Sequence, residues 1–269
     1  MTVTLRRHHR VPGGFTLVEV MIALAIIVVL AVLAVQGSHH LIQGARLTTS
    51  MANLKSLAAA NATYHADNGV FCPADDQQNL RRWHGRRSSA SGGFDPADGL
   101  LAPYLGQSRS VGICPLFKAT VEDEKSFESG TGGYGYNSSY IGGKPGGTYD
   151  RNTKLRVSER MANIYDPART VMFTTTAYAR TGGLQEYAYC EPPFWDYGSG
   201  PSGDRPSPTV HFRANGKALV AWCDGHLSAE RNNREDDHGT NPHGGDSHEF
   251  ELGWFGPEEQ NGYWNPRRR

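Results

Sequence analysis

The chain has 269 residues, a length that suits one anchoring segment and one globular domain of about 200 residues. The 27 basic and 27 acidic residues balance, and basic residues cluster only in the first ten positions and at the final Arg267-Arg268-Arg269, so no nucleic-acid partner is expected. The 32 glycines and 15 prolines, nearly all after Gly37, predict a loop-rich domain with short strands.

The first predicted element is an apolar helix that follows a short basic leader. Residues 20–35 contain no charged or polar side chain, and Glu19 is the only ionisable residue from Phe15 to Val35. A helix over residues 15–36 would be about 30 Å long, which matches one bilayer core. The arginines of the leader would stay in the cytoplasm and direct the C-terminal domain across the membrane. Residues 15–36 are therefore predicted to be a transmembrane and assembly helix.

A processing signal lies before this apolar run, whereas an ordinary secretory signal has its small-residue cleavage site after it. The residues after Val35 begin Gln36-Gly37-Ser38 and offer no such site. The segment Gly13-Gly14-Phe15-Thr16-Leu17-Val18-Glu19 resembles the type IV prepilin signal. That resemblance implies a leader over residues 1–14, cleavage between Gly14 and Phe15 by prepilin peptidase, methylation of Phe15, and a glutamate at the fifth mature position.

Glu19 is an exception in this apolar segment, because a carboxylate near a membrane core costs on the order of 3 kcal/mol. It therefore needs a partner. The resemblance implies that the partner is the N-terminal amine of Phe15 on a neighbouring subunit, which would set the register during assembly. The alternative is that Glu19 lies close enough to the membrane interface to remain hydrated.

The helix is predicted to continue through residues 37–69 as an amphipathic segment, because no proline interrupts the chain between Phe15 and Asn68. Asn68-Gly69 is a fitting end, and Gly37 and Gly44 are points where the helix could bend. The apolar stripe that should pack on the globular domain consists of Leu47, Met51, Leu54 and Ala58.

The globular domain is predicted to occupy residues 70–269. Residues 71–99 read as an irregular surface segment, and the basic run Arg81, Arg82, Arg86 and Arg87 is interpreted as a solvated loop in preference to an anion site. Residues 170–175 and 218–223 predict strands, and Asp224-Gly225 predicts a hairpin turn that leads into a return strand. The predicted fold class is α+β, with the long helix packed on a small antiparallel sheet, as in pilins.

The domain is also similar to a group of prepilin-like proteins that carry a histidine nine residues ahead of an Asp-Gly pair, the H-X9-DG pattern. Counting back from Asp224 places Ala214 at the position of that histidine, and the nearest histidine is His211. The turn motif Asp224-Gly225 is intact. The resemblance extends to type II secretion pseudopilins. The similar segments are residues 111–115, 133–137, 166–173 and 215–226.

Cysteines in an exported domain are expected to be oxidised, and four cysteines allow three pairings. Pairs Cys72–Cys114 and Cys190–Cys223 are favoured because each closes a loop of moderate length; the alternative is four buried thiols.

Metal binding and catalysis are not expected. His238, His243 and His248 recur among acidic residues, but their spacing matches no metal motif, and a flexible polar loop is favoured. The chain has no nucleophile elbow, phosphate-cradling glycine loop or His-Glu-x-x-His helix, so neither a cofactor nor an enzymatic activity is predicted. Packing is favoured over a ligand surface for the aromatic residues Tyr187, Tyr189, Phe194, Trp195, Tyr197, Trp254, Phe255, Tyr263 and Trp264.

These patterns together predict a structural or minor subunit of a type IV pilus-like or type II secretion pseudopilus filament. The expected partners are prepilin peptidase, other pilin or pseudopilin subunits and the bacterial inner membrane, which the chain would cross once with its C-terminal domain outside the cytoplasm. The alternative is a membrane-tethered, pilin-like binding module that contacts a surface, a substrate or an exported protein.

Overall fold

The computed structural model describes residues 15–118, 120, 128–233 and 244–268, with the backbone alone over residues 34–40. The chain forms two compact units, Met1–Ala45 and Arg46–Arg269. One long helix, α1 (Leu17–Asn68), contributes its first part to the first unit and the remainder to the second. The second unit adds short strands and 3₁₀ helices, and the predicted α+β fold class is confirmed.

The first unit exposes its apolar side chains. From Phe15, which is 90% exposed, to Leu33, which is 60% exposed, every described side chain is open to solvent. In the stretches whose side chains are described, no helix combines the length and the apolar character that a membrane crossing requires.

The second part of α1 packs on the globular unit through one face. Leu54, Leu57 and Ala58 are at most 2% exposed, which confirms the predicted roles of Leu54 and Ala58. The buried residues recur at three- to four-residue intervals, as the geometry of one helix face requires. The helix passes through Gly44 without interruption and ends at Asn68.

The end of α1 is fixed by Gly69. This glycine adopts a left-handed conformation with φ of 72°, and its N–H donates to the carbonyl of His65 at 2.8 Å. Glycine reaches this conformation without a steric penalty, which explains why the helix ends here. The predicted end at Asn68-Gly69 is confirmed.

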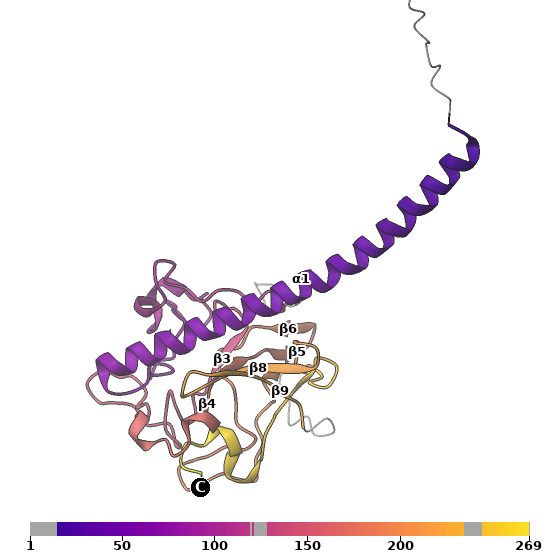
Figure 1. The fold of residues 1–269 in the computed structure, drawn as a ribbon. Coiled ribbons are helices and arrows are strands. Elements are labelled where there is room, and N and C mark those ends of the chain that lie inside the picture. The colour runs from indigo at the N-terminus through magenta and orange to yellow at the C-terminus, as the bar shows by residue number, and fades with distance from the viewer. Residues whose placement is uncertain (1–14, 119, 121–127, 234–243, 269) are drawn as a thin grey trace, which may run out of the picture. The chain divides into compact units, whose positions relative to one another are not determined.

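A four-stranded antiparallel sheet forms the centre of the second unit, in the order β3-β4-β8-β9. Figure 1 shows the second part of α1 running over this sheet. The strands predicted at residues 170–175 and 218–223 are confirmed as β4 and β8. The sheet consists of β3 (Tyr134–Tyr136), β4 (Val171–Thr175), β8 (Lys217–Trp222) and β9 (Leu227–Arg231).

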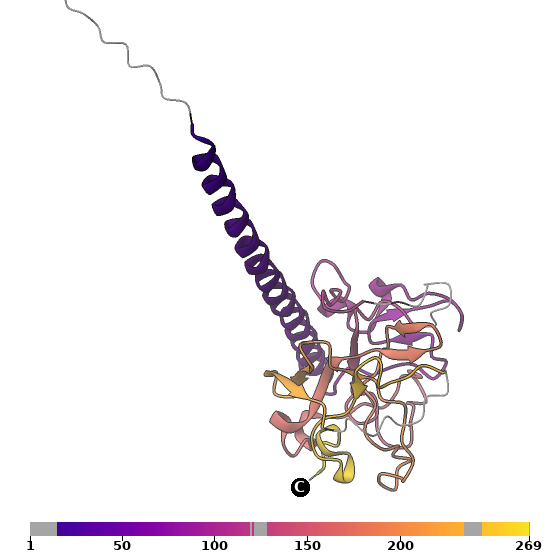
Figure 2. The ribbon, with the colours of Figure 1, turned by 90° about the vertical axis from the view of Figure 1, so that its right-hand side faces the viewer.

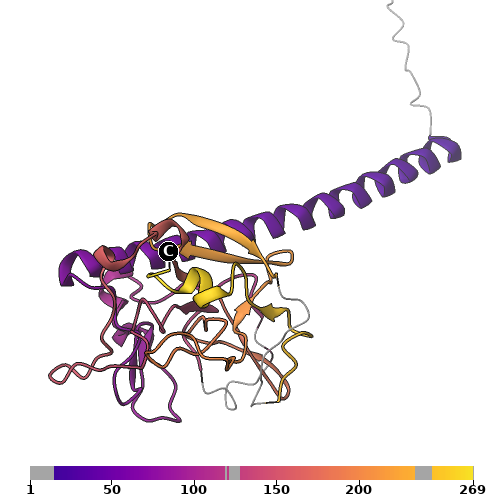
Figure 3. The same ribbon diagram turned by 90° about the horizontal axis from the view of Figure 1, so that it is seen from below.

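Both faces of β8 are covered, so its residues alternate between two hydrophobic clusters. Leu219 and Ala221 pack in the cluster that includes α1, while Ala218, Val220 and Trp222 pack in a second cluster with Trp254, Phe255 and Trp264. Figures 2 and 3 show the C-terminal segment on the face of the sheet away from α1. A near-continuous apolar strand is the pattern that burial on both faces produces.

The turn between β8 and β9 is confirmed at Asp224-Gly225. Gly225 has φ of 87°, its N–H donates to the carbonyl of Trp222 at 2.9 Å, and the Asp224 carboxylate accepts the N–H of His226 at 3.0 Å. Lys55 on α1 donates to the carbonyl of Gly225 at 2.6 Å. The turn therefore helps to attach the sheet to the helix.

Residues 71–99 are only in part the surface excursion that the sequence predicts. Phe71, Cys72 and Trp83 are fully buried, and the Trp83 ring contacts Phe173 of β4 edge-on at 5.3 Å between centroids. The Trp83 indole N–H donates to the carbonyl of Ala188 at 2.9 Å. Single aromatic residues between polar ones show no hydrophobic periodicity, so the sequence gives no indication that they are buried.

The remaining elements are short. Two-stranded pairs are formed by β1 (Arg81–Arg82) with β2 (Gly85–Arg86), β5 (Tyr178–Arg180) with β6 (Gly183–Gln185), and β7 (Val210–His211) with β10 (Leu252–Gly253). The 3₁₀ helices are η1 (Pro96–Asp98), η2 (Ala102–Tyr104), η4 (Met161–Asn163), η5 (Pro167–Arg169) and η6 (Glu259–Trp264).

The predicted disulfide bonds are not formed: all four cysteines are free and buried. The Cys72 N–H bonds to Asn61 of α1, whereas the Cys114 sulfur contacts the hydroxyl of Ser50 at 3.3 Å. Eleven helix positions separate these two contacts, which is about 16 Å along the axis and far beyond disulfide reach.

The second predicted pair, Cys190–Cys223, is not formed either. Cys190 belongs to the cluster on the outer face of the sheet, and Cys223 to the cluster beneath α1. Burial raises the pKa of both thiols, which keeps them protonated and unreactive.

Candidate functional site

The N-terminal turn of α1 brings together the predicted assembly residues. The Glu19 carboxylate accepts the backbone N–H of Thr16 and its hydroxyl, both at 2.8 Å, and the Glu19 N–H donates back to the Thr16 hydroxyl at 3.3 Å. This reciprocal arrangement is a capping box, which satisfies helix N–H groups that otherwise lack partners. Thr16 was not singled out from the sequence, although Thr-x-x-Glu ahead of an apolar run is the signature of such a box.

The capping box holds the Glu19 carboxylate at the helix end, beside the predicted mature N-terminus. Phe15 precedes Thr16 directly and is almost fully exposed. A carboxylate at a helix N-terminus is stabilised by the helix dipole, so the negative charge is held where an incoming amine could meet it. Gly14 and the predicted leader over residues 1–14 lie outside the described residues.

The helix beyond this turn presents an uninterrupted apolar surface. Large side chains such as Met21, Ile27 and Leu30 are 59–62% exposed and lie on all sides of the helix. Apolar surface of this extent is unfavourable in water and marks a region that contacts other protein or lipid. The segment can therefore associate, while the second unit has its own core.

In the second unit, the four arginines of the basic run lie on or beside the β1–β2 hairpin, and they have different surroundings. Arg82 is buried and pairs with Glu128, while Arg81 and Arg86 lie directly opposite each other on the two strands. They line an open pocket of about 560 Å³, together with Arg87 and Lys154. The interpretation of a solvated loop is wrong for Arg82 and Arg87, which are buried, whereas Arg86 is exposed and Arg81 is half-buried.

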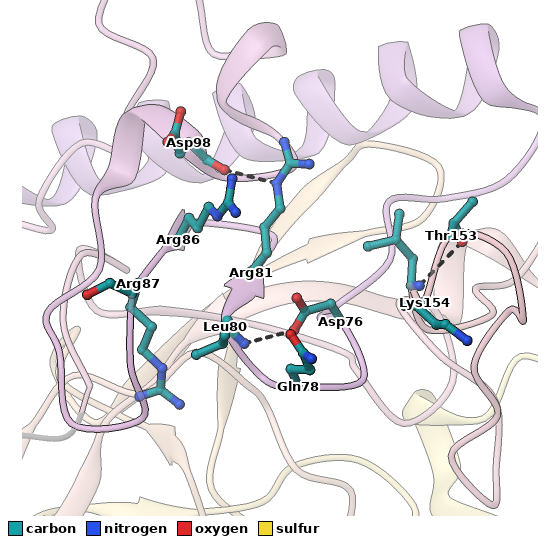
Figure 4. A pocket seen from close by; sticks show the side chains of 11 residues that line it. Asp76, Gln78, Leu80, Arg81, Arg86, Arg87, Asp98, Thr153 and Lys154 are labelled. Carbon is teal, nitrogen blue, oxygen red and sulfur yellow. Dashed lines mark hydrogen bonds between the residues drawn. The ribbon is translucent and has the colours of Figure 1, made fainter.

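Figure 4 shows how this arginine pocket is arranged. Arg81 and Arg86 extend in the same direction, toward Asp98, and the Arg81 Nε donates to the Asp98 carbonyl at 3.1 Å. Arg87 extends the opposite way, where its Nε donates to the carbonyl of Asn79 at 3.1 Å. Lys154 comes from a separate loop, which sequence spacing did not connect with the arginines.

Most of the aromatic residues that the sequence groups between Tyr187 and Trp264 are buried or half-buried. Trp254, Phe255 and Trp264 are at most 1% exposed, as the packing interpretation expects, whereas Tyr197 is 65% exposed. Tyr187 and Trp195 line a smaller pocket of about 230 Å³ with Glu191.

Glu191 is an unusual carboxyl group in that smaller pocket. It is 5% exposed, one oxygen accepts the hydroxyl of Tyr187 at 3.1 Å, and the other has no hydrogen-bond partner. Burial raises its pKa to about 7, with Asp75 and Glu128 adding to the increase.

Ala214, which stands where the H-X9-DG pattern would have its histidine, is buried in the cluster that contains α1. Ala214 and Lys217 exchange backbone hydrogen bonds across Asn215 and Gly216, which both have positive φ. This is a tight two-residue hairpin turn. His211 is separately buried in β7, where burial holds its pKa well below the usual value.

Metal ligands are not assembled within the described parts of the chain, where no group of three or more His, Cys, Asp or Glu side chains could hold an ion. His238 and His243 lie outside the described residues. In the remainder of that segment, the Asp246 carboxylate accepts the N–H of His248 at 2.8 Å, as in a local turn.

Comparison with known families gives one match. Residues 10–35 match the model of the prokaryotic N-terminal methylation motif, the region that contains the predicted cleavage junction, Phe15 and Glu19. No curated protein and no solved structure shows significant similarity to the chain. The motif supports a type IV prepilin-like protein that is a substrate of prepilin peptidase, associated with the cell envelope and able to assemble with other pilin-type subunits.

Proposed function

We propose that this chain is a structural or minor subunit of a type IV pilus-like filament or a type II secretion pseudopilus, acting by assembly rather than catalysis. The observation that carries the proposal is the methylation motif at residues 10–35, which overlaps an exposed apolar helix that begins at Leu17. Processing after Gly14 would place a new amine within one residue of the capping box.

Glu19 would exchange partners during assembly. In the isolated chain its carboxylate caps its own helix through Thr16. The charged amine of Phe15 on a neighbouring subunit would form an ion pair with it instead, and the attraction between two opposite charges is stronger in an apolar surrounding than in water. The exchange would favour the assembled state and fix one register between subunits.

Before assembly, residues 15–36 would anchor the chain in the bacterial inner membrane. The leader arginines would remain in the cytoplasm, and the second unit would lie on the other side. The uninterrupted apolar sequence of residues 20–35 supports this arrangement.

The test separates insertion from assembly. Glu19→Ala should enter the membrane as well as the parent, because a charge has been removed, and yet fail to form filaments or crosslinked multimers. Glu19→Gln should retain at most partial assembly. The matched control is Thr16→Val, which removes the capping hydroxyl but keeps the carboxylate, and should assemble.

The second candidate function is a membrane-tethered binding module, and the open arginine pocket favours it. Normal multimers from Glu19→Ala would show that the carboxylate is incidental and would favour this candidate. Cellular abundance also distinguishes the two, since a major filament subunit must be plentiful and a binding module need not be.

A further inference from the structure

The arginine pocket of the second unit holds like charges in direct opposition. Arg81 and Arg86 are paired residues of the antiparallel β1–β2 hairpin, so their side chains lie on the same face. Like charges at opposed positions are destabilising. Within the described residues neither arginine forms an ion pair, so the structure provides no internal compensation for this repulsion.

Two further cations line the pocket. Arg87 is held by the carbonyls of Asn79 and Ala90 at 3.1 and 2.9 Å, and burial, followed by the charge of Arg82, lowers its pKa. Lys154 is exposed on the facing loop.

The loop that carries Lys154 is fixed beside the hairpin by backbone contacts. The N–H of Gln77 donates to the Lys154 carbonyl at 2.8 Å, and Leu155 forms an isolated bridge with Asp76. Since Asp76 in turn donates its N–H to the carbonyl of Arg81, the lysine and the arginine pair are held on one continuous backbone framework. The backbone positions of Lys154, Arg81 and Arg86 are therefore fixed relative to one another.

The carboxylates of the pocket do not balance these charges. Asp76 and Asp98 are its two acidic residues. Asp76 accepts the N–H of Leu80 at 2.8 Å, and Arg81 bonds to the backbone carbonyl of Asp98 rather than to its carboxylate. Arg87 extends away from the arginine pair, so Arg81, Arg86 and Lys154 are the cations set against the two carboxylates, and they leave one positive charge in excess.

We propose that this pocket binds a dianionic oxyanion, in particular a phosphate group carried on a small organic molecule. The guanidinium group presents a planar fork of donors that matches phosphate oxygens, and two such forks lie side by side at Arg81 and Arg86. The volume of about 560 Å³ leaves room for an attached organic part of sugar size.

The inference is independent of the filament role, and its test leaves Glu19 unchanged. The full chain in an uncharged detergent is titrated calorimetrically with inorganic phosphate and with a hexose phosphate at low ionic strength. Binding of both would show recognition of the phosphate group, and tighter binding of the hexose phosphate would show that the rest of the pocket contributes. Sulfate should compete, whereas acetate, with one charge, should compete at least tenfold more weakly, on the order expected for one lost charge-assisted bond.

Variants locate the site. Arg86→Gln should weaken phosphate binding on the order of tenfold or more, and Arg86→Lys should weaken it less because the charge remains. Arg160→Gln, an equal charge change at an exposed position outside the pocket, should leave binding unchanged. Thermal unfolding provides the folding control, since relief of the repulsion with Arg81 means that Arg86→Gln should melt no lower than the parent.

The proposal is overturned by any of three results. The parent chain could fail to bind phosphate, acetate could compete as well as sulfate, or Arg86→Gln and Arg160→Gln could weaken binding equally. Binding that appears only with long polyanions, and falls steeply with salt in every variant, would also overturn it in favour of a diffuse electrostatic surface.

Discussion

Asn61 joins the helix to the sheet through buried hydrogen bonds, so its replacement tests how α1 is docked. Its side-chain oxygen accepts the N–H of Cys72 at 2.8 Å, and its amide donates to the Tyr136 hydroxyl at 3.0 Å. The same hydroxyl donates to the carbonyl of Cys72 at 2.9 Å. All three residues are fully buried, so water does not replace a lost partner.

Asn61→Ala leaves the Cys72 N–H unsatisfied and removes one of the two hydrogen bonds of the Tyr136 hydroxyl described above. An unsatisfied buried group costs about 1–3 kcal/mol, and the cavity adds to this, so we expect a loss of about 3 kcal/mol. For a domain of this size such a loss lowers the melting temperature by roughly 6–12 °C.

The matched control is Asn53→Ala on the same helix. Asn53 is half-buried and donates an exposed hydrogen bond to the carbonyl of Ile113 at 3.1 Å, so its replacement should cost less than about 1 kcal/mol. Tryptophan fluorescence is a suitable assay, because Trp83, Trp254 and Trp264 are fully buried in the folded unit. Equal melting temperatures for the two variants would refute the docking described for Asn61.

Three further predictions concern the second unit. The pKa of Glu191 is raised to about 7 from an ordinary value of 4.5, so stability from this group is full below the lower value and declines as the pH rises toward the higher one. Glu191→Gln should therefore melt like the parent near pH 4 and be more stable than the parent by on the order of 3 kcal/mol near pH 8. A stability difference that does not change with pH would contradict this. Because both proteins contain the same buried histidines, the contributions of those histidines cancel in the comparison. Gly99→Ala should destabilise the domain by roughly 2 kcal/mol, because the new Cβ would lie 2.6–2.9 Å from backbone atoms of residues 83–85. The control is Gly93→Ala, whose Cβ would meet no atom within 4 Å and which should be neutral. Equal stabilities of the two variants would contradict this prediction. Alkylation under denaturing, non-reducing conditions should label every cysteine, and fewer than four labels would show a disulfide among Cys72, Cys114, Cys190 and Cys223.

The long helix and the central hairpin were predictable because their signals are local. Leu54 and Ala58 recur at helical spacing and are buried, and the helix ends where Asn68-Gly69 predicts. The turn at Asp224-Gly225 likewise forms where a favourable turn pair separates apolar runs. The same reasoning, applied to Asn215-Gly216, would also have found the hairpin turn that follows Ala214.

Features that depend on contacts distant in sequence were not predictable. Trp83 is buried because it meets Phe173, ninety residues later, and nothing in its neighbourhood indicates that contact. The favoured cysteine pairs rested on loop length, whereas the attachment of Cys72 and Cys114 to different turns of α1 keeps them apart. Arg81 and Lys154 share a pocket only because the backbone of Asp76 bridges to Leu155.

The mature N-terminus provides the most direct test of the central claim, that the chain is processed and assembled as a prepilin. The measurement is the mass of the N-terminal peptide from protein isolated from the cell envelope. We expect a peptide that begins at Phe15 and carries one N-methyl group, as the methylation motif at residues 10–35 implies. A mature chain that begins near Ser38, or one that retains Met1 and the leader, would contradict the account.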